Sequence, residues 1–584
     1  MGAKVSGYNQ RVKKTSEKVF LLIIFLILGL FHLVYLDRFP AGINHDEIEY
    51  ILSAKTYFLT GADLSGSYFP NSIFQTKTEG VISFLPSLIL APYFGVVPIN
   101  QVTARLPYVL INLITAGVLY LLIKKIFGNE RFGRLTAVIF LINPWSFYLS
   151  RTATDTAFSL LFYLVGILLM VGNSKKKIWL SFLFLVLGFF SYHGAKVIFI
   201  PLIAVVMGYK LAESRSKIKN YWWVLGAGIG IMILYFGTGS IFFNQSVRET
   251  RSGDIWLLNQ DRLANTVDTY RKMSIENGLG RLFMNKMTVA TEIFFQKYLT
   301  AFSPEVLFVS GDTRGTYRFG YHGLFYIVDF VLILVGLVNL YKKYPKGAGF
   351  LISLGLISPL ATAVSGVETS VINRSFLLLP VLVILASFGI IKIYNLVSGK
   401  LGKMFTLIVF SGSGLIFFLN FLHFYFFRLP ITGQENYFFS QKIMANYIDR
   451  LGDQKLVVVD KEPREVFLET IFYSKNDKDL GLKEFVRDQN LKFKNVLFVS
   501  ECPEKIDSET VYIINRSFDK CLSKDNRKSI NEEQFGGPLY YVINDSLCSD
   551  FELQSWTRFH LRDNYVIEKL SDKDFCQNWI KEII

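Results

Sequence analysis

Apolar stretches long enough to cross a membrane recur along the first 430 residues of this chain of 584 residues. A helix needs about 20 mainly apolar residues to span the hydrocarbon core of a bilayer. The sequence predicts about eleven such helices, at approximately residues 19–36, 103–123, 135–150, 156–173, 178–192, 197–212, 221–243, 323–341, 348–366, 373–394 and 404–426. We therefore expect a polytopic α-helical membrane protein.

Lysine and arginine clusters orient these helices, because short cytoplasmic loops collect positive charge. Residues 1–18 hold such a cluster and are predicted to form a cytoplasmic N-terminus. Further clusters fall in alternate connections, within residues 124–134, 175–177, 210–219, 342–346 and 392–403. With all of them on the cytoplasmic side of the cell membrane, the eleventh helix leads to an outer C-terminus. The formal net charge of +15 suits anionic lipid headgroups and gives no reason to expect a nucleic-acid partner.

The segment Val81 to Val97 is apolar but short, and Pro86 and Pro92 interrupt it. Proline removes a backbone donor that lipid cannot replace. Counting this segment as a membrane span would also place the cluster at 124–134 outside. We therefore predict an interfacial or re-entrant helix within one long outer loop, residues 37–102.

Two other regions are predicted to lie outside, a loop at residues 244–322 and the tail at 430–584. In the tail, short β-like runs at 455–460, 495–500, 510–515 and 539–543 flank a helical pattern at 462–473. The expected fold is an extracytoplasmic α/β domain following a transmembrane catalytic domain at 19–429. All four cysteines lie in the tail, which suits two disulfides, although three pairings are open.

An acidic pair, Asp46-Glu47, follows the first predicted span and stands where the bilayer gives way to water. Residues Asn44 to Thr60 have the spacing of an amphipathic helix lying on the membrane. One reading of the acids is structural, since Asn44 is a good helix N-cap and Glu47 stands at the capping-box position. The other reading is catalytic, because carboxylates at this depth can meet a lipid-borne and a soluble substrate.

Ionisable residues from other predicted spans converge on the same outer face. They are Arg105 at the start of the second span, Asp155 before the fourth, His193 and Lys196 between the fifth and sixth, and Arg374 at the start of the tenth. A single charged residue at a helix end usually anchors the helix at the interface. Acids and bases from separate helices on one face favour a functional site instead.

These motifs, in their order and on this side of the membrane, resemble those of the GT-C superfamily of membrane glycosyltransferases. The resemblance is to the branch of protein O-mannosyltransferases and aminoarabinose transferases of lipid A, and it covers about residues 15–425. It is carried by Asp46-Glu47, Arg105-Leu106-Pro107, Phe127-Gly128, Thr154-Asp155, Phe302 to Asp312, and Arg374 to Pro380.

The resemblance implies transfer of a sugar from a polyprenyl-phosphate donor to an acceptor on the outer face. Asp46 would be the general base, and Asp155 a second catalytic acid. Arg374 would hold the phosphate of the donor, since a guanidinium can bind phosphate oxygens bidentately. The predicted substrate-binding residues are Glu47, Arg105, His193, Lys196 and Arg374.

No cofactor is expected from this resemblance, and a divalent metal is possible but not favoured, since adjacent acids on a helix point about 100° apart. The stretch Lys77-Thr-Glu-Gly-Val lacks a Pro-Pro-Leu motif common in the family, which leaves the acceptor open. A transferase of preassembled lipid-linked oligosaccharides is the alternative enzyme. A lipid or solute transporter fits less well, because the polar residues gather at one face and no repeated halves are evident.

Overall fold

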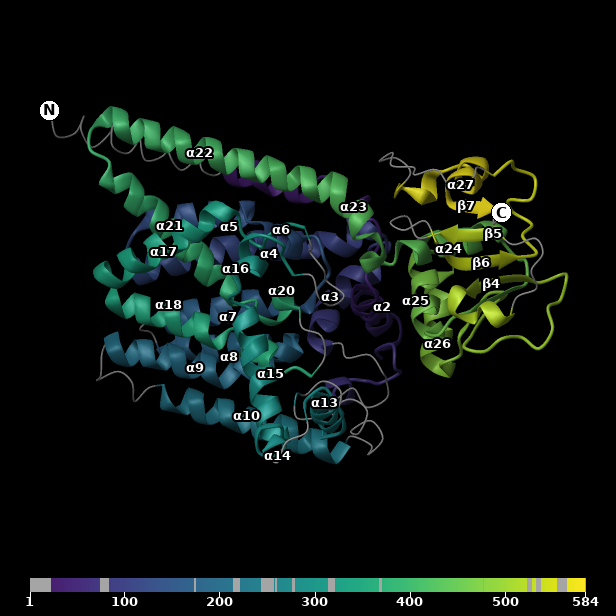
Figure 1. Ribbon diagram of the computed structural model, residues 1–584, viewed down its shortest axis with the longest axis horizontal. Helices are drawn as coiled ribbons and strands as arrows, with labels where there is room; N and C mark the ends of the chain where they lie inside the picture. Colours follow the sequence, from purple (N-terminus) through teal and green to yellow (C-terminus); the bar gives the residue numbers. More distant parts are fainter. Residues whose placement is uncertain are drawn as a thin grey trace.

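The structure is a computed structural model, and it describes residues 23–73, 83–172, 175–213, 221–242, 257, 260–275, 279–312, 321–366, 370–475, 477–521, 528–531, 537–553 and 565–582. It contains a long bundle of apolar helices, with a C-terminal unit built on a β-sheet beyond one end of the bundle (Figure 1). The predicted basic connections lie at one end of this bundle, and the candidate site residues lie at the other end.

The bundle is formed by helices that mostly run parallel to its long axis (Figure 1). They are an apolar helix at Ile23–Leu33, α4 (Gln101–Phe127), α5 (Glu130–Ile142), α6 (Pro144–Ser150), α7 (Asp155–Met170), α8 (Lys175–Ser191), α9 (His193–Glu213), α10 (Trp222–Phe242), α17 (Ile327–Lys343), α18 (Pro345–Ile357), α19 (Leu360–Ala363), α20 (Val371–Arg374), α21 (Leu378–Leu396) and α22 (Lys400–His423). Each of the eleven predicted spans contains a helix. Among the described residues, five helices have the length and hydropathy of a complete span, or six when the bent pair α6–α7 counts as one.

Helix packing in the bundle depends on aromatic side chains and on small residues. The rings of Phe132 and Phe388 stack with centroids 4.3 Å apart and join α5 to α21. Helices α17 and α21 cross so closely at Gly336 and Gly389 that a Cβ on either glycine would collide with a backbone carbonyl of the other helix. Such close crossings are typical of membrane helices, which associate through packing rather than through the hydrophobic effect.

The predicted basic connections meet at one end of the bundle. Lys125, at the end of α4, is within electrostatic range of Lys177 and Lys210, which belong to two other connections. The Lys210 ammonium donates to the carbonyl of Val171 at the end of α7, at 2.9 Å. These contacts agree with the predicted alternation of helix directions.

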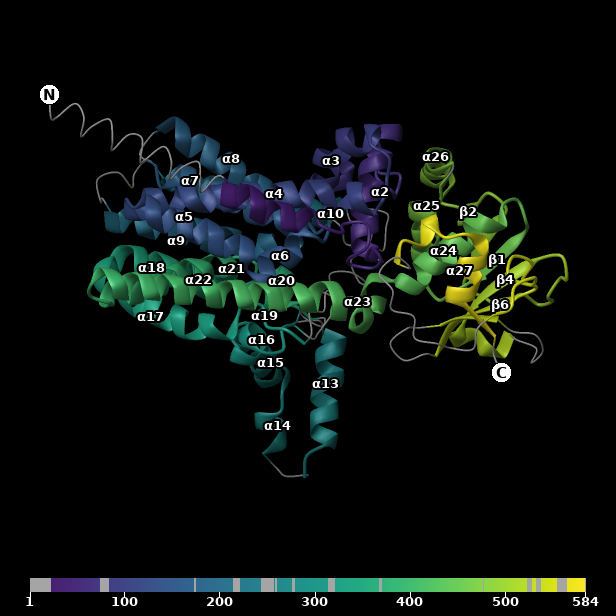
Figure 2. The same ribbon diagram turned by 90° about the horizontal axis from the view of Figure 1, so that it is seen from above.

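The segment between the first helix and α4 forms three short helices at the other end of the bundle: α2 (His45–Thr60), η1 (Asn71–Ile73) and α3 (Phe84–Val96). Helix α3 corresponds to the proline-interrupted segment. With 13 residues and Pro92 inside, it is too short to cross a bilayer and packs beside α2 (Figure 2).

The described residues of the second predicted outer loop are mainly helical. It contains α13 (Gln260–Lys272), α14 (Gly280–Phe283), α15 (Lys286–Thr300) and α16 (Pro304–Phe308). Helices α13 and α14 project from the side of the bundle in Figure 2. The loop thus has regular structure where the sequence predicted only an outer connection.

The chain leaves α22 through η4 (Phe424–Arg428), α23 (Leu429–Thr432) and η5 (Gln434–Tyr437) and enters the C-terminal unit, residues 439–582. Its helices are α24 (Phe439–Leu451), α25 (Pro463–Tyr473), α26 (Lys478–Asp488), η6 (Arg516–Cys521), η8 (Ile567–Lys569) and α27 (Asp572–Trp579). Its strands are β1 (Leu456–Val459), β2 (Lys492–Phe493), β3 (Val496–Val499), β4 (Val511–Asn515), β5 (Lys528–Asn531), β6 (Pro538–Ile543) and β7 (Ile580–Glu582). All four β-like runs of the sequence form strands, and the predicted helix at 462–473 is α25.

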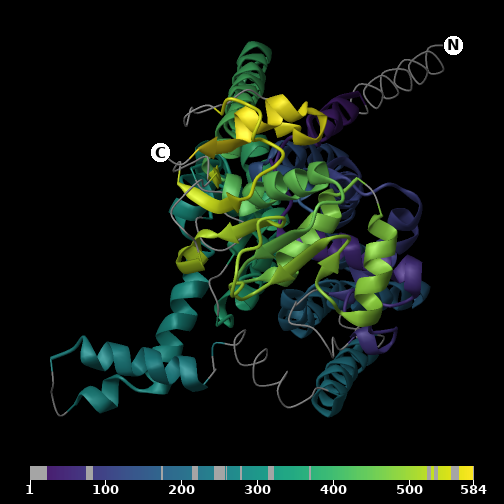
Figure 3. The same cartoon turned by 90° about the vertical axis from the view of Figure 1, so that its right-hand side faces the viewer.

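The seven strands form one mixed sheet in the order β2-β3-β1-β4-β6-β5-β7, which faces the viewer in Figure 3. Strand β1 is parallel to its neighbours β3 and β4, and the remaining pairs are antiparallel. Of the three possible cysteine pairings, the structure has Cys502–Cys521 and Cys548–Cys576. Both disulfides connect segments within the C-terminal unit.

Candidate active site

Helix α2 begins with the capping arrangement that the sequence suggested for Asn44 and Glu47. The Asn44 side chain accepts from the Asp46 backbone N–H at 3.0 Å, and the Glu47 carboxylate accepts from the Asn44 N–H at 3.3 Å. Glu47 is fully buried, whereas Asp46 is exposed. Two adjacent acids therefore occupy different environments, because consecutive helical residues point about 100° apart.

Glu47 also ties α2 to the bend between α6 and α7. Its other carboxylate oxygen accepts from the Ala153 backbone N–H at 2.6 Å. Burial raises the pKa of Glu47, while the nearby Arg105 guanidinium opposes that rise. Both hydrogen bonds that the structure gives the Glu47 carboxylate are thus to backbone N–H groups, and they orient α2.

One turn further along α2, Tyr50 connects this helix to Asp155. The Tyr50 hydroxyl donates to the Asp155 carboxylate at 2.5 Å, and both side chains are buried. Burial and the adjacent carboxylate raise the pKa of Tyr50 well above its usual value, so the phenol remains a hydrogen-bond donor. Asp155 opens α7 at a 114° bend from α6, and Asp46 and Lys196 both lie within electrostatic range of it.

The start of α9 contributes His193 and Lys196. The Lys196 ammonium lies 3.0 Å from Nδ1 of His193 and 4.8 Å from the ring centroid of Tyr235, and the side chain is largely buried. The preceding residue, Tyr192, lies within hydrogen-bonding range of Arg374 and within electrostatic range of Asp155. Bases from α9 and α20 thus face the acids of α2 and α7.

Arg374 is the last residue of the short helix α20. The Asp312 carboxylate accepts hydrogen bonds from the backbone N–H groups of Val371 and Ile372, so it caps the N-terminal end of this helix. The Nη1 atom of Arg374 is buried without a hydrogen-bond partner among the described residues. A buried guanidinium nitrogen with an unused donor is available to an anionic group.

Arg105 lies close to the site but does not face it. Its side chain is fully buried, and its guanidinium donates to the carbonyls of Leu36, Pro40 and Gly42. The Nη donors of Arg105 are thus used by the backbone, and a substrate contact of Arg105 stays a prediction. The physical reason for the backbone contacts is the irregular backbone at residues 36–42, whose carbonyl groups need donors away from water.

Two important residues were not predicted from the sequence. Arg151 is buried like Arg105 and donates to the carbonyls of His32, Tyr35 and Phe39, so the two arginines together bind the chain that leads into α2. Tyr50 was classed only as part of an amphipathic helix. Lys77 and Glu79, which precede α3, lie outside the described residues.

The described part of the chain contains no group of three or more His, Cys, Asp or Glu side chains arranged to hold a metal ion. The described residues that meet at the candidate site are Asp46, Asp155, His193, Lys196 and Arg374, with Tyr50 and Tyr192 between them.

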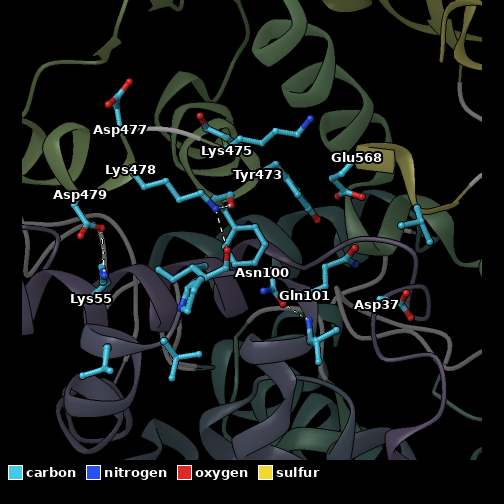
Figure 4. Close-up of a pocket in the computed structure, with 18 of the residues that line it drawn as sticks. Asp37, Lys55, Asn100, Gln101, Tyr473, Lys475, Asp477, Lys478, Asp479 and Glu568 are labelled. Carbon is cyan, nitrogen blue, oxygen red and sulfur yellow. Dashed lines mark hydrogen bonds and ion pairs between the residues drawn. The ribbon is translucent and has the colours of Figure 1, made fainter. Parts of the chain in front are cut away.

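Beside this site lies a cavity of about 880 Å³ at the junction with the C-terminal unit (Figure 4). Its wall combines residues 95–102, which connect α3 to α4, with residues 472–475 and 477–479 and with Val566, Glu568 and Lys569 of the C-terminal unit. Ion pairs and hydrogen bonds cross the junction here, including Lys55 to Asp479 at 3.2 Å and Lys478 to the Ile99 carbonyl at 3.0 Å.

One family model matches part of this chain. Residues 83–237 match the family described as dolichyl-phosphate-mannose-protein mannosyltransferase. No curated protein sequence matches this chain. The structure is similar to that of ArnT from Cupriavidus metallidurans bound to undecaprenyl phosphate, with 12% identity, a TM-score of 0.47, and coverage of 91% of this chain and 98% of that chain. ArnT in the apo state gives 12% identity, a TM-score of 0.46, and coverage of 91% and 99%.

Proposed function

We propose that this chain is a multi-pass membrane glycosyltransferase of the GT-C superfamily, which transfers a sugar from a polyprenyl-phosphate-linked donor to an acceptor hydroxyl at the outer face of the membrane. The matched family is named for enzymes that use dolichyl phosphate mannose. The observation that carries the proposal is the meeting of Asp46, Asp155, Lys196 and Arg374 at the bundle end opposite the basic connections.

Asp46 is the proposed general base. It is exposed at the start of α2, where a substrate can reach it, and the positive end of the helix dipole favours its charged form. The acceptor hydroxyl gives its proton to the Asp46 carboxylate as its oxygen bonds to the anomeric carbon. The bond from that carbon to the phosphate oxygen breaks, and the polyprenyl phosphate leaves with the electron pair. Such proton transfer contributes about 10²–10⁴-fold to the rate.

Asp155 is the proposed second acid of the site. Its carboxylate is fixed by the Tyr50 hydroxyl at 2.5 Å, which leaves other carboxylate lone pairs for an acceptor hydroxyl. Because Asp155 is buried and Asp46 is exposed, the two acids suit different tasks. Asp46 exchanges a proton, and Asp155 orients the acceptor.

The bases stabilise the leaving phosphate in this proposal. Arg374 has an unused donor at Nη1, and Lys196 adds a second positive charge with His193 beside it. Fixed cations placed where negative charge develops are among the largest contributions to catalysis. Glu47 and Arg105 are assigned the structural task of fixing α2, in view of their contacts with backbone groups.

The outer location of the site is supported by charge and by cysteine chemistry. The basic connections meet at the far end of the bundle, as the positive-inside rule expects for the cytoplasmic side. Two disulfides in the C-terminal unit suit an oxidising compartment. We place this unit outside the cell membrane on these grounds.

The direct test is the substitution Asp46→Asn in the full-length protein, assayed with a polyprenyl-phosphate sugar. Loss of at least about 10²-fold in transfer, with donor binding retained, is expected for removal of a general base. Glu305→Gln is a matched control, since Glu305 is also an exposed acid in the first turn of a helix. Transfer at the normal rate by Asp46→Asn would refute the assignment.

The sugar and the acceptor require a separate experiment. Mass spectrometry of glycoproteins, glycolipids and surface glycans from a deletion strain would show which hydroxyl loses its sugar. Loss of a single sugar supports the monosaccharide donor proposed here. Loss of a complete oligosaccharide would instead identify a transferase of preassembled glycans.

A further inference from the structure

The C-terminal unit and the segment leading to it hold the first turn of α2 from outside the bundle. The Ile43 backbone N–H donates to the Tyr473 hydroxyl at 3.0 Å, and the Asn44 side chain donates to the Asn436 carbonyl at 3.1 Å. These partners are separated along the chain by 430 and 392 residues. The N-cap of the helix that carries Asp46 is therefore anchored by distant parts of the protein.

His45, the residue between the N-cap and Asp46, lies between two carboxylates of α25. Its Nε2 atom is 2.8 Å from Glu465, and its Nδ1 atom is 2.7 Å from Glu469. Its ring also lies against Phe438, with centroids 3.6 Å apart. The imidazolium form has an N–H on each nitrogen and can therefore donate to both carboxylates, whereas a neutral imidazole has only one N–H. We refer to His45, Glu465 and Glu469 as the His45 cluster.

Electrostatics favour the charged form of His45 in this environment. Burial lowers the pKa of His45, but Glu469 and Glu465 outweigh burial and raise it to about 10. Glu469 is fully buried, and among the described residues its ion pair is with His45. The other charged groups on this side are Arg464, which pairs with Glu49 of α2, and Asp460, which lies within electrostatic range of Glu469.

We propose that the C-terminal unit is a positioning element of the catalytic centre, and that the His45 cluster fixes the first turn of α2 and with it the Asp46 carboxylate. The proposal rests on the proposed role of Asp46 as general base. His45 and Asp46 are consecutive helical residues, so when one faces α25 the other points about 100° away. Holding His45 therefore sets the direction of Asp46.

The far end of α2 is held by a different and weaker contact. Lys55, three turns from His45, pairs with Asp479 of α26 (Figure 4). Asp479 is more than half exposed, and such surface pairs contribute little to stability. The His45 cluster, in which Glu469 is fully buried, is therefore the stronger of these two contacts, and the Lys55 pair provides a matched control in the same junction.

A double-mutant cycle on the full-length protein tests this coupling. His45→Ala and Glu469→Ala are each expected to lower kcat by about 10- to 100-fold, because small displacements of a catalytic group have effects of this size. The KM for the polyprenyl-phosphate sugar should stay within about twofold, since the phosphate-binding residues are elsewhere. The double variant should be no slower than the slower single variant, because both remove the same contact. Additive losses would overturn the proposal.

A milder substitution gives a pH readout that a merely structural contact would not give. In Glu469→Gln, His45 keeps Glu465 but loses one of the two charges that oppose burial, so its pKa must fall from about 10. We expect kcat of this variant to decrease as pH rises from 6 to 9, whereas wild type shows no such decrease from this group. Asp479→Asn should retain the wild-type profile. Superimposable profiles for wild type and Glu469→Gln would contradict the proposal.

Hydrogen exchange of peptides covering residues 43–60 separates this proposal from the proposed function. His45→Ala should increase exchange in the first turn of α2, with little change near Lys55. If wild type lacks glycosyl transfer but the exchange result is as expected, the proposed function fails while the contact stands. If the first turn loosens and kcat is unchanged, the positioning role is wrong and the function stands.

Discussion

Loss of the charge of Asp46 should abolish transfer with little effect on stability, whereas loss of the charge of Glu47 should lower stability and leave much of the transfer activity. We compare Asp46→Asn with Glu47→Gln, which remove one charge each and preserve side-chain size. Asp46 is exposed, and exposed substitutions usually change stability by no more than about 0.5 kcal/mol, with a helix-dipole contribution of about 0.3–1 kcal/mol. Asp46→Asn should therefore fold nearly as well as wild type and fail in transfer.

Glu47→Gln has a larger structural effect. The Glu47 carboxylate accepts one backbone N–H on each oxygen, from Ala153 at 2.6 Å and from Asn44 at 3.3 Å. An amide has one acceptor oxygen, so its NH₂ group must face one of these donors. Loss of a hydrogen bond to a charged group costs about 1.5–3 kcal/mol. Burial raises the pKa of Glu47, so removing its charge recovers part of that cost. We expect the free energy of unfolding to fall by about 1.5 kcal/mol.

The measurement is the free energy of unfolding in mixed micelles, taken with the transfer rate on the same preparations. Glu47→Gln should unfold more readily than Asp46→Asn by about 1 kcal/mol and retain much more transfer activity. Glu47→Gln with wild-type stability and no transfer would show that the buried acid is the base. That result would refute the division of roles drawn from burial and hydrogen bonding.

Three further predictions follow from other parts of the structure. Tyr50→Phe removes a hydroxyl that donates to a buried carboxylate, so it should destabilise the protein by about 1.5–3 kcal/mol, measured by thermal unfolding in detergent. Among exposed positions, Lys475→Cys should react with a membrane-impermeant thiol reagent outside intact cells, whereas Arg131→Cys should react only after permeabilisation; the reverse pattern would invert the topology. The Cys502–Cys521 disulfide should be reduced before Cys548–Cys576, because Cys502 is exposed and the second pair is buried, as mass spectrometry after limited reduction would show.

Much of the bundle could be predicted because its signals are local. Membrane helices appear in the sequence as long apolar runs, and basic connections give their direction. The same holds for the cap of α2, since Asn44 and Glu47 are three residues apart and need no distant partner. Placing acids and bases at one membrane face required only the correct alternation of helices.

The contacts that give each residue its task could not be predicted in this way. Tyr50 and Asp155 are 105 residues apart, and His45 and Glu469 are 424 apart, so no local pattern relates them. The backbone contacts of Arg105 could not be predicted either, because a charged residue at a helix end looks the same in the sequence whether it faces a ligand or a backbone. Only the path of residues 36–42 shows that the Nη donors of Arg105 bind backbone carbonyls.

The path of residues 36–42 explains why several buried charged residues surround the exposed Asp46 carboxylate. The chain between the first helix and α2 is irregular and buried, and a backbone of this kind needs hydrogen-bond donors that lipid cannot supply. Arg105 and Arg151 provide them, Glu47 fixes the start of α2 to the bend before α7, and His45 fixes it to α25. Each of these contacts restricts the motion of the first turn of α2, and none involves the Asp46 carboxylate. A general base must be accessible to its substrate yet held in one position. Asp46 meets both conditions because it is exposed, while the residues on either side of it fix the turn that carries it.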